Sequence, residues 1–442
     1  MAFSPVKASS GSVSIDSSKS YSTALSSLTI LFFMMGFITV LNDILIPYLK
    51  LIFQLSYAKV MLINMCFFGA YFFMSIPSGW IVQKIGYKKG MLLGFLIAAV
   101  GCLLFYPAAA TRIYAFFLIA LFVLASGITL LQVSGNPYVA ILGSPETSSS
   151  RLTLTQAFNA LATFVGPFIG TYFILKSLPK LPDNLKNLND FTTLTPLQQL
   201  DFDKLMAVLN LSALQYTYVI LACVFITITL VMTFIKLPQI QPETGIDTDL
   251  SESVSIHKSV WSYKHLVFGA IGIFAYVGGE VAIGSFLVNY LGHKDVANLP
   301  EHVAGYYVMF YWGGAMVGRF ISSYVLSKLN PGKVLLTNAI IVVALISATI
   351  LIGGNISMYT ILSVGLFNSL MFPTIFTLAI KNLGKFTEQG SGILCTAIVG
   401  GALVPFLQGL LADQIGIRYA FFIPIICYLY VAWYGWKGHK ED

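Results

Sequence analysis

Apolar segments long enough to cross a membrane recur along this chain, and they constrain its fold more than any other feature. Residues 334–380 hold two such segments, separated at Gly353-Gly354-Asn355, and the segments 265–291 and 302–327 are each interrupted by a single charge. A helix that spans the bilayer needs about 20 apolar residues. We therefore predict twelve transmembrane helices. The other eight segments, which carry no charge at all, are 20–42, 60–83, 90–111, 113–145, 152–175, 205–235, 389–412 and 419–436.

The overall composition excludes a soluble protein. Charged residues make up 10% of the chain, against about 25% in a soluble domain. The net charge of +7 does not indicate a nucleic-acid partner, because the Lys and Arg residues are scattered over short loops. All five cysteines lie in apolar segments, which favours buried thiols over disulfides or metal ligands. We expect no metal and no cofactor, and a lipid bilayer as the surroundings of the chain.

The polar segments predict how the chain is divided. Residues 1–22 are Ser-rich and are expected to form a disordered tail. Residues 237–262 form a polar linker between a first bundle at 23–236 and a second at 263–438, with six spans in each. An external loop at 177–210 includes the amphipathic stretch DFDKLMAVL, which predicts a helix within it.

The distribution of positive charge predicts the orientation. Of the 25 Lys and Arg residues, 15 lie in loops on the side of the N-terminus, nine lie on the other side, and Arg319 lies within a span. Because cytoplasmic loops carry the excess of Lys and Arg, both termini are predicted to be cytoplasmic. We expect a monomeric, multi-pass protein of the cell (inner) membrane.

The two halves carry the same landmarks at nearly the same spacing. Four matches at offsets between 236 and 244 residues pair span 1 with 7, 2 with 8, 4 with 10 and 5 with 11. Parallel six-span repeats describe the major facilitator fold. We therefore predict an all-α membrane protein with two pseudo-symmetric six-helix bundles. The matches are Asp43 with Glu280, Gly69 and Lys84 with Gly313 and Lys328, Gln132 and Pro137 with Asn368 and Pro373, and Pro167 with Pro405.

Two acids lie inside predicted spans, Asp43 in the first and Glu280 in the seventh. An ionisable group at the centre of a span costs about 2.5–3.5 kcal/mol on insertion scales, so its presence indicates a function. A carboxyl group among apolar neighbours favours its neutral form, which suits it to carry a proton. Such a pair indicates cation-coupled transport. The alternative is a fixed ion pair with Arg319, the only cation within a span.

The loop between spans 2 and 3 resembles a superfamily signature. GWIVQKIGYK at residues 79–88 is similar to the major facilitator pattern G-x-x-x-D-R/K-x-G-x-R/K, with Gly79, Lys84, Gly86 and Lys88 at the matching positions. Gln83 stands where an Asp is usual. The resemblance implies a conformational latch at this loop rather than a substrate site.

Several longer motifs follow one another along the chain: GFITVLNDILIPYLK, LASGITLLQVSGNPYVAILG, RLTLTQAFNALATFVGPFIG, YVGGEVAIGSFLVNYL, MFPTIFTLAI and SGILCTAIVGGALVPFLQGLLAD. These motifs resemble the fucose:proton symporter family of that superfamily, and its glucose/galactose branch in particular. The resemblance covers residues 24–436 and implies import of a neutral monosaccharide driven by a cation, normally H⁺. Fucose-type members have a Glu at the position of Gln132, so the second acid here is Glu280, and Na⁺ stays open as the coupling ion.

A pocket for a neutral sugar needs amides for the hydroxyl groups and an aromatic side chain for the ring. Gln156 and Asn159 are spaced i, i+3 and align with pocket amides of the family, and Gln132 and Asn136 are spaced i, i+4 before Pro137. Structural roles such as hydrogen bonds between helices also favour amides in membranes. The predicted sugar-contact residues are Gln132, Asn136, Gln156, Asn159 and Asn289, with Tyr276 and Trp312 as the aromatic candidates.

Several other functions compete with a sugar symporter. A uniporter or a non-transporting sensor on the same fold would have no need of two acids within spans. Many drug antiporters place their acids differently and lack the set of amides. We predict no enzymatic activity, because HExxH, GxSxG and paired catalytic Asp motifs are absent. The absence of a P-loop argues against ATP as the energy source.

Overall fold

The computed structural model describes residues 18–55, 57–173, 194–208, 211–238 and 259–440. Throughout these ranges the chain is helical and forms no strand. The predicted tail lies outside the described residues up to residue 17, and the first helix begins at Ser18. Most of the predicted linker, residues 239–258, also lies outside them.

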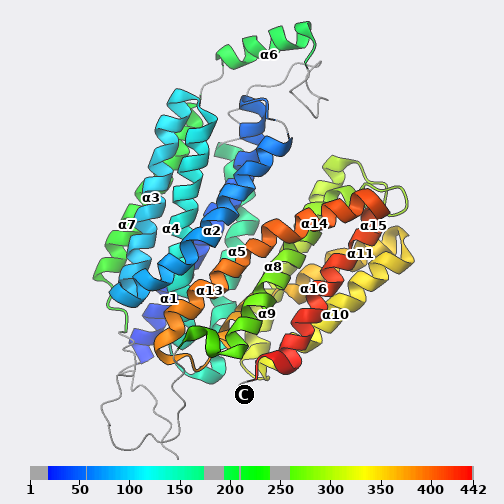
Figure 1. Cartoon of the computed structure of the whole chain (residues 1–442). Helices are drawn as coiled ribbons and strands as arrows, with labels where there is room; N and C mark the ends of the chain where they lie inside the picture. The colour runs from blue at the N-terminus through cyan, green and yellow to red at the C-terminus, as the bar shows by residue number, and fades with distance from the viewer. Residues whose placement is uncertain (1–17, 56, 174–193, 209–210, 239–258, 441–442) are drawn as a thin grey trace, which may run out of the picture.

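The helices between Ser18 and Phe173 are joined by short connections. The helix α6 lies apart from the bundle, at the end of the molecule opposite the C-terminus (Figure 1), and it falls within the predicted external loop. Gly86, at φ 82°, joins α2 to α3, which explains the glycine of the loop signature because other residues rarely adopt this φ. The helices are α1 (Ser18–Ile52), α2 (Tyr57–Ile85), α3 (Tyr87–Thr111), α4 (Tyr114–Ile141), α5 (Ser148–Phe173), α6 (Pro196–Val208) and α7 (Ser212–Phe234).

The second half repeats this arrangement with more interruptions. Asn330 caps α10 by accepting a hydrogen bond from the backbone N–H of Lys333 at 3.1 Å, and Pro331 occupies the first helical position. The helices are α8 (Lys264–Leu291), α9 (Glu301–Leu326), α10 (Pro331–Ile352), α11 (Gly354–Asn368), α12 (Met371–Ala379), α13 (Thr387–Thr396), α14 (Gly400–Ile415), α15 (Ile417–Ala420) and α16 (Phe422–Trp433). In Figure 1, α1 to α4 and α7 lie on the left and α10, α11, α15 and α16 on the right, while α13 reaches across to α2.

Among the described residues, eleven segments are long and apolar enough to cross a membrane, rather than the twelve predicted. The remaining predicted span, 302–327, is formed by α9, which packs against α5, α8 and α11. Arg319 and several glycine and tyrosine residues make α9 less apolar than the other spans. By its position in the bundle α9 is the twelfth predicted span, but its sequence is not apolar enough to be counted among the eleven.

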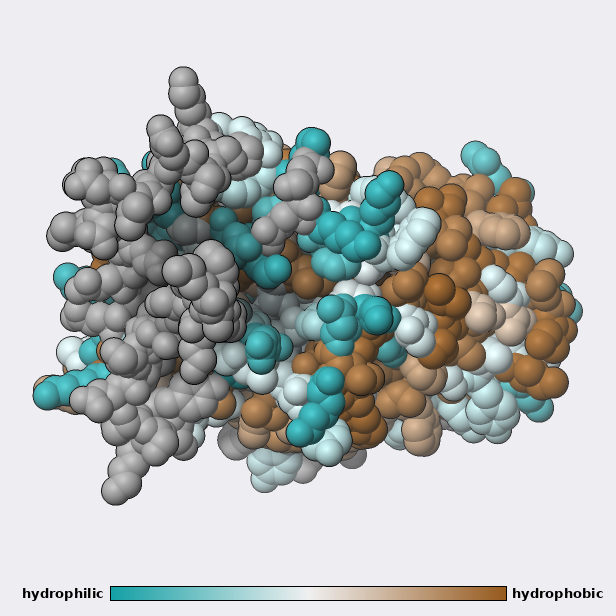
Figure 2. All heavy atoms as spheres, turned by 90° about the horizontal axis from the view of Figure 1, so that it is seen from below, coloured by the Kyte–Doolittle hydropathy of each residue, from teal (hydrophilic) through white to brown (hydrophobic). Residues whose placement is uncertain are grey.

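The molecule exposes large apolar side chains on its flanks. Phe234 is 84% exposed and Leu351 is 78% exposed, which a soluble protein rarely tolerates over a large area. Seen from the end that carries the C-terminus, the described side chains are hydrophilic near the centre and hydrophobic along one flank (Figure 2). This distribution fits a protein whose ends contact water and whose sides contact lipid.

Two pairs of helices make the main contacts between the halves, and they lie at the same end of the molecule. The start of α5 contacts the end of α9. The hydroxyl of Ser150 donates to the backbone oxygen of Ser323 at 2.7 Å, and the hydroxyl of Ser323 donates to the backbone oxygen of Ser150 at 3.0 Å. The end of α2 contacts α13, where a Cβ on Gly79 would lie 2.8 Å from the backbone oxygen of Glu388. The central space between the halves is therefore closed at the end that carries the C-terminus.

Side-chain amides reinforce this closure at the loop signature. Gln389 Nε2 donates to Gln83 Oε1 at 3.0 Å, and Gln83 Nε2 donates to the backbone oxygen of Lys385 at 3.4 Å. The residue that departs from the signature thus binds across the two halves. This contact agrees with the predicted latch role of the loop.

Candidate functional site

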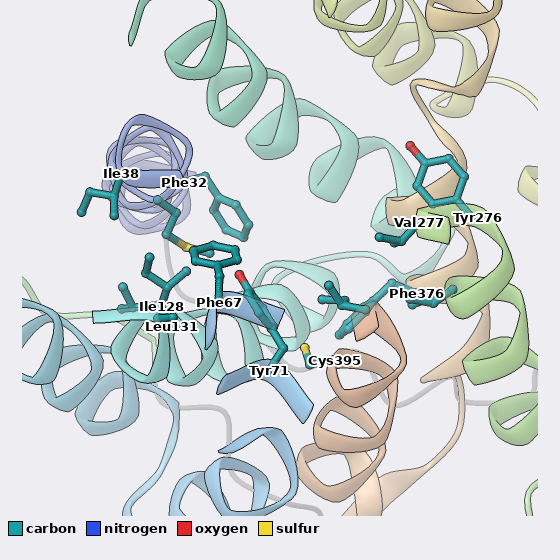
Figure 3. Close-up of a cluster of buried hydrophobic side chains, with 14 of the residues drawn as sticks. Phe32, Ile38, Phe67, Tyr71, Ile128, Leu131, Tyr276, Val277, Phe376 and Cys395 are labelled. Carbon is teal, nitrogen blue, oxygen red and sulfur yellow. The ribbon is translucent and has the colours of Figure 1, made fainter. Parts of the chain in front are cut away.

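A line of hydrogen-bonded side chains runs through the first half toward the second. Gln132 Nε2 donates to the hydroxyl of Tyr71 at 3.1 Å, and Asn136 Nδ2 donates to Gln132 Oε1 at 3.0 Å. Gln156 Nε2 then donates to Asn136 Oδ1 at 3.2 Å. Three of the predicted sugar-contact amides, from α4 and α5, are therefore in direct contact. Cys395 of α13 lies next to Tyr71 (Figure 3), so the line begins where the two halves meet.

The start of α5 fixes where its amides lie. Arg151 is buried, and its guanidinium donates to the backbone oxygens of Val139 and Ala140 at 3.3 and 2.8 Å. These carbonyls lie at the end of α4, so Arg151 holds α4 and α5 in register. This register brings Gln156 against Asn136, one and a half turns along α5.

Asn159, the fourth amide, contacts a different helix. Its Nδ2 donates to the backbone oxygen of Phe32 on α1 at 3.0 Å. The two helices are very close here, because a Cβ on Gly36 would overlap the backbone oxygen of Asn159. In this conformation Asn159 therefore stabilises the packing of α1 on α5, the structural role that amides also have in membranes.

The second half contains a buried cluster around Glu280. The acid is 8% exposed, and the hydroxyl of Tyr276 donates to its Oε1 at 2.8 Å. The hydroxyl of Tyr311 on α9 donates to the backbone oxygen of Glu280 at 3.4 Å. Asn368 on α11 donates to the hydroxyls of Tyr311 and of Tyr428 on α16, at 2.9 and 3.3 Å. The acid within the seventh span is thus enclosed by tyrosines and one amide, and it does not face lipid.

Arg319 does not neutralise Glu280 by direct contact. No ion pair within 4.0 Å joins the two residues, both of which the structure describes, although the Arg319 charge acts on the acid through space. The guanidinium instead donates to the backbone oxygens of Ser369 and Gln156, both at 3.2 Å. The structure therefore shows no fixed ion pair between Arg319 and Glu280, and Arg319 links the two halves. An ion pair of Arg319 with Asp43 stays untested, because the Asp43 side chain lies outside the described residues.

The other predicted residues lie apart from these clusters. Asn289 is exposed near the end of α8. Trp312 is 38% exposed, packs edge-on against Tyr311 at 5.1 Å between ring centroids, and lies against Gly284 of α8. Asp43 belongs to α1, but its side chain lies outside the described residues.

Tyr276 was predicted as a site residue, but the sequence patterns did not mark Tyr71, Tyr311, Tyr428 or Asn368 as such. The bond from Gln132 on α4 to Tyr71 on α2 has a counterpart in the bond from Asn368 on α11 to Tyr311 on α9. The amides are 236 positions apart and the tyrosines 240, within the range of offsets that defined the repeat. The match of Gln132 with Asn368 was therefore a usable signal, but the tyrosines were hidden among 23 residues of that type.

Two repeated helical bundles around enclosed polar clusters, with apolar flanks, define a multi-pass membrane transporter. The family profile of the Major Facilitator Superfamily matches residues 28–398. The chain belongs to this superfamily, which confirms the predicted fold class and makes the protein a transporter rather than an enzyme.

Curated relatives match almost the whole chain. It is 51% identical over 425 residues to the glucose/galactose transporter of Brucella abortus, with 96% of each chain covered. It is 47% identical over 424 residues to a putative glucose/galactose transporter of Helicobacter pylori, covering 95% of this chain and 97% of the relative. It is 31% identical over 415 residues to the L-fucose-proton symporter of Escherichia coli, covering 93% and 92%. These relatives confirm the resemblance drawn from the motifs.

A solved structure agrees with the arrangement of the helices. The crystal structure of the Major Facilitator Superfamily transporter FucP in the outward conformation matches with a TM-score of 0.83 and 29% identity. The match covers 95% of this chain and 99% of that one. The closure described above, at the end that carries the C-terminus, is consistent with the same conformation.

Proposed function

We propose that the protein imports a neutral hexose similar to glucose or galactose, by symport with H⁺ through alternating access. The observation that carries this proposal is the line of neutral amides from Gln132 through Asn136 to Gln156, which ends beside the closure between the halves. Amides both donate and accept hydrogen bonds, as sugar hydroxyl groups do. The named activities of the glucose/galactose transporters and of the L-fucose-proton symporter support the same substrate class and coupling ion.

The proposed sugar site combines the amides of the first half with residues of the second. Gln132, Asn136, Gln156 and Asn159 would bind hydroxyl groups, together with Asn289. Trp312, which is partly exposed, is the better placed of the two aromatic candidates, because Tyr276 is 1% exposed and engaged with Glu280. An anionic substrate would instead need a committed cation, and Arg319 is occupied by two backbone carbonyls.

Asp43 and Glu280 are the proposed coupling groups. In this scheme a proton enters with the sugar from the open side and leaves on the cytoplasmic side, so that both acids change protonation during the cycle. The orientation rests on the positive charges, which favour cytoplasmic termini in the inner membrane. We propose that a single copy suffices for transport, since each chain contains both bundles.

Counterflow in proteoliposomes tests the substrate and the ion together. Purified protein would be assayed with a panel of hexoses, deoxy-hexoses and hexosamines, with and without Na⁺, at several pH values. The proposal is supported if the rate of glucose or galactose uptake depends on the pH gradient and does not change when Na⁺ is added. A strict requirement for Na⁺ would favour the sodium-coupled alternative, and preference for an anionic solute over every hexose would refute the assignment.

Two variants test the residues. Asp43→Asn should abolish uphill accumulation but keep counterflow, because the amide can hydrogen-bond but cannot titrate. Gln156→Ala should weaken sugar binding about 5- to 150-fold, because losing a buried hydrogen-bond partner costs about 1–3 kcal/mol and 1.4 kcal/mol is a factor of ten. Gln215→Ala is the matched control, since Gln215 bonds only the backbone of Tyr106 at 3.1 Å. Equal affinities in the two Gln variants would contradict the site.

A further inference from the structure

Asn368 carries a buried acceptor that nothing in the described part of the chain satisfies. The residue is fully buried, and its Oδ1 receives no hydrogen bond. The orientation of the amide is fixed by Tyr311, whose single hydroxyl hydrogen points to the backbone oxygen of Glu280. The Tyr311 oxygen must therefore accept from the amide nitrogen, and the unpaired atom is the carbonyl oxygen. Leaving such an atom unpaired costs about 1–3 kcal/mol.

The equivalent position in the first half shows what is missing. Gln132 has the same bond to a tyrosine, but its oxygen is satisfied by Asn136, four residues further along α4. Four residues after Asn368 stands Phe372, which offers no donor. The chain keeps helical dihedral angles across the short break at Ser369 and Leu370, so Phe372 occupies the corresponding place. The donor that the repeat supplies in one half is absent from the other.

Glu280 and Asn368 share two tyrosine neighbours, Tyr311 and Tyr428. Tyr311 contacts both residues, at 3.4 Å from the backbone oxygen of Glu280 and 2.9 Å from Asn368 Nδ2. Tyr428 also touches both sides of the cluster, because its hydroxyl accepts from Asn368 at 3.3 Å and its ring lies against Gly279. An ionised Glu280 has only acceptors and cannot use Asn368 Oδ1, whereas a protonated Glu280 gains one O–H donor.

We propose that Asn368 is the positioning residue for the coupling proton, and that its Oδ1 accepts the hydrogen bond from the protonated carboxyl of Glu280. This inference rests on the proposed function, in which Glu280 takes up a proton. The proton comes from the aqueous phase on the open side and binds Oε2, since Oε1 already accepts from Tyr276. No covalent bond changes besides the O–H bond itself. When the proton leaves, Tyr276 continues to hold the ionised acid.

The other groups around Glu280 do not offer a competing acceptor of this kind. Arg319 on α9 is positive, the hydroxyl of Tyr276 donates to the acid, and the hydroxyls of Tyr311 and Tyr428 already accept from the Asn368 amide. Cys427 on α16 lies next to Tyr428 and Gly279. The remaining charged side chains that the structure describes on helices packed against α8 lie toward helix ends, namely Glu388 on α13, Asp413 on α14, Arg418 on α15 and Lys437 in the helical turn 434–438.

The test is the pH profile of purified protein, with Asn368→Leu as the main variant. Removing the acceptor penalises only protonated Glu280, so the pH midpoint of hexose counterflow should fall by about one unit, which corresponds to 1.36 kcal/mol. Asn338→Leu is the matched control, because Asn338 also lies within a span but donates to its own helix, to Val334 at 2.9 Å. An unchanged midpoint in Asn368→Leu, or an equal shift in both variants, would overturn the proposal.

A second variant keeps the test decisive if Asn368→Leu does not fold. Phe372→Asn restores the i+4 amide of the first half and gives Asn368 Oδ1 a permanent donor, which competes with the proton. The midpoint should again fall, and an unmoved midpoint would refute the role of Asn368.

A measurement that needs no transport separates this inference from the proposed function. The melting temperature of the native protein in detergent should rise on acidification, as protonated Glu280 bonds Asn368. That rise should disappear in Glu280→Gln and in Phe372→Asn. If hexose uptake fails but this pattern holds, the proposed substrate is wrong and the proton site stands. If uptake succeeds and the rise persists in both variants, the proton site is wrong.

Discussion

The close approach of α2 to α13 makes Gly79 a sensitive point of the closure. Adding a methyl group there places a Cβ 2.8 Å from the backbone oxygen of Glu388, and carbon atoms are essentially never this close to backbone oxygen without a shift of the helices. Such overpacking costs about 1–3 kcal/mol. The cost falls only on the conformation in which the two helices touch, so Gly79→Ala should reduce the closed population relative to the open one by about 5- to 150-fold.

Gly69→Ala is a control on the same helix. A Cβ on Gly69 meets nothing within 4 Å, while the gain in helix propensity of about 1 kcal/mol applies to both variants. Any difference between them therefore reports the contact with Glu388 and not the stiffness of α2.

Alkylation of Cys395 measures the opening. This residue lies on α13 next to Tyr71 (Figure 3) and is fully buried in the closed conformation. The two glycine substitutions would be made in a variant that keeps only this cysteine. If the open state is rare in both, the Gly79→Ala protein should react with a maleimide about 5- to 150-fold faster than the Gly69→Ala protein, which corresponds to the overpacking cost of about 1–3 kcal/mol. Rates within twofold of each other would show that the glycine contact does not hold the closure.

Two further substitutions follow from the hydrogen bonds. Gln408→Leu should raise the melting temperature, because Gln408 is fully buried and neither amide atom has a hydrogen-bond partner among the described residues. An unpaired buried polar group costs about 1–3 kcal/mol. A lower melting temperature would mean that the Gln408 amide finds a hydrogen-bond partner in the membrane. Arg319→Lys should speed alkylation of Cys395 as well, because an ammonium on a flexible stem cannot reproduce the fixed fork that contacts Ser369 and Gln156; an unchanged rate would show that these bonds do not stabilise the closure.

The sequence predicted most of the fold because the bilayer imposes a length and a composition on each span. The break at Gly353-Gly354-Asn355 was placed correctly, since α10 ends at Ile352 and α11 begins at Gly354. The composition of α9 is the exception. Its Arg319 is accommodated because the guanidinium bonds to two backbone carbonyls rather than to lipid or water alone.

The site was less predictable, because spacing along a helix does not say which neighbour a side chain meets. The i, i+4 spacing of Gln132 and Asn136 did predict their contact, which is local to α4. Gln156 and Asn159 share a spacing of three residues, yet one bonds to α4 and the other to α1. That difference depends on how α5 packs between two helices, which no local pattern contains.

Transport by symport requires that the sugar and the cation influence each other, and such coupling needs two sites that bias the same structural change. Arg319 is the residue through which the described clusters touch. Its guanidinium bonds the backbone of Gln156, whose side chain ends the amide line of the first half, and the backbone of Ser369, which follows Asn368 directly. The bond to Gln156 exists only while α5 and α9 are together, whereas the bond to Ser369 lies within the second half. If a change at either cluster moved its backbone too far for the hydrogen bond to Arg319 to persist, that bond would break and the closure would be weakened. The Arg319 side chain therefore provides a physical route from the proposed sugar site to the proposed proton site.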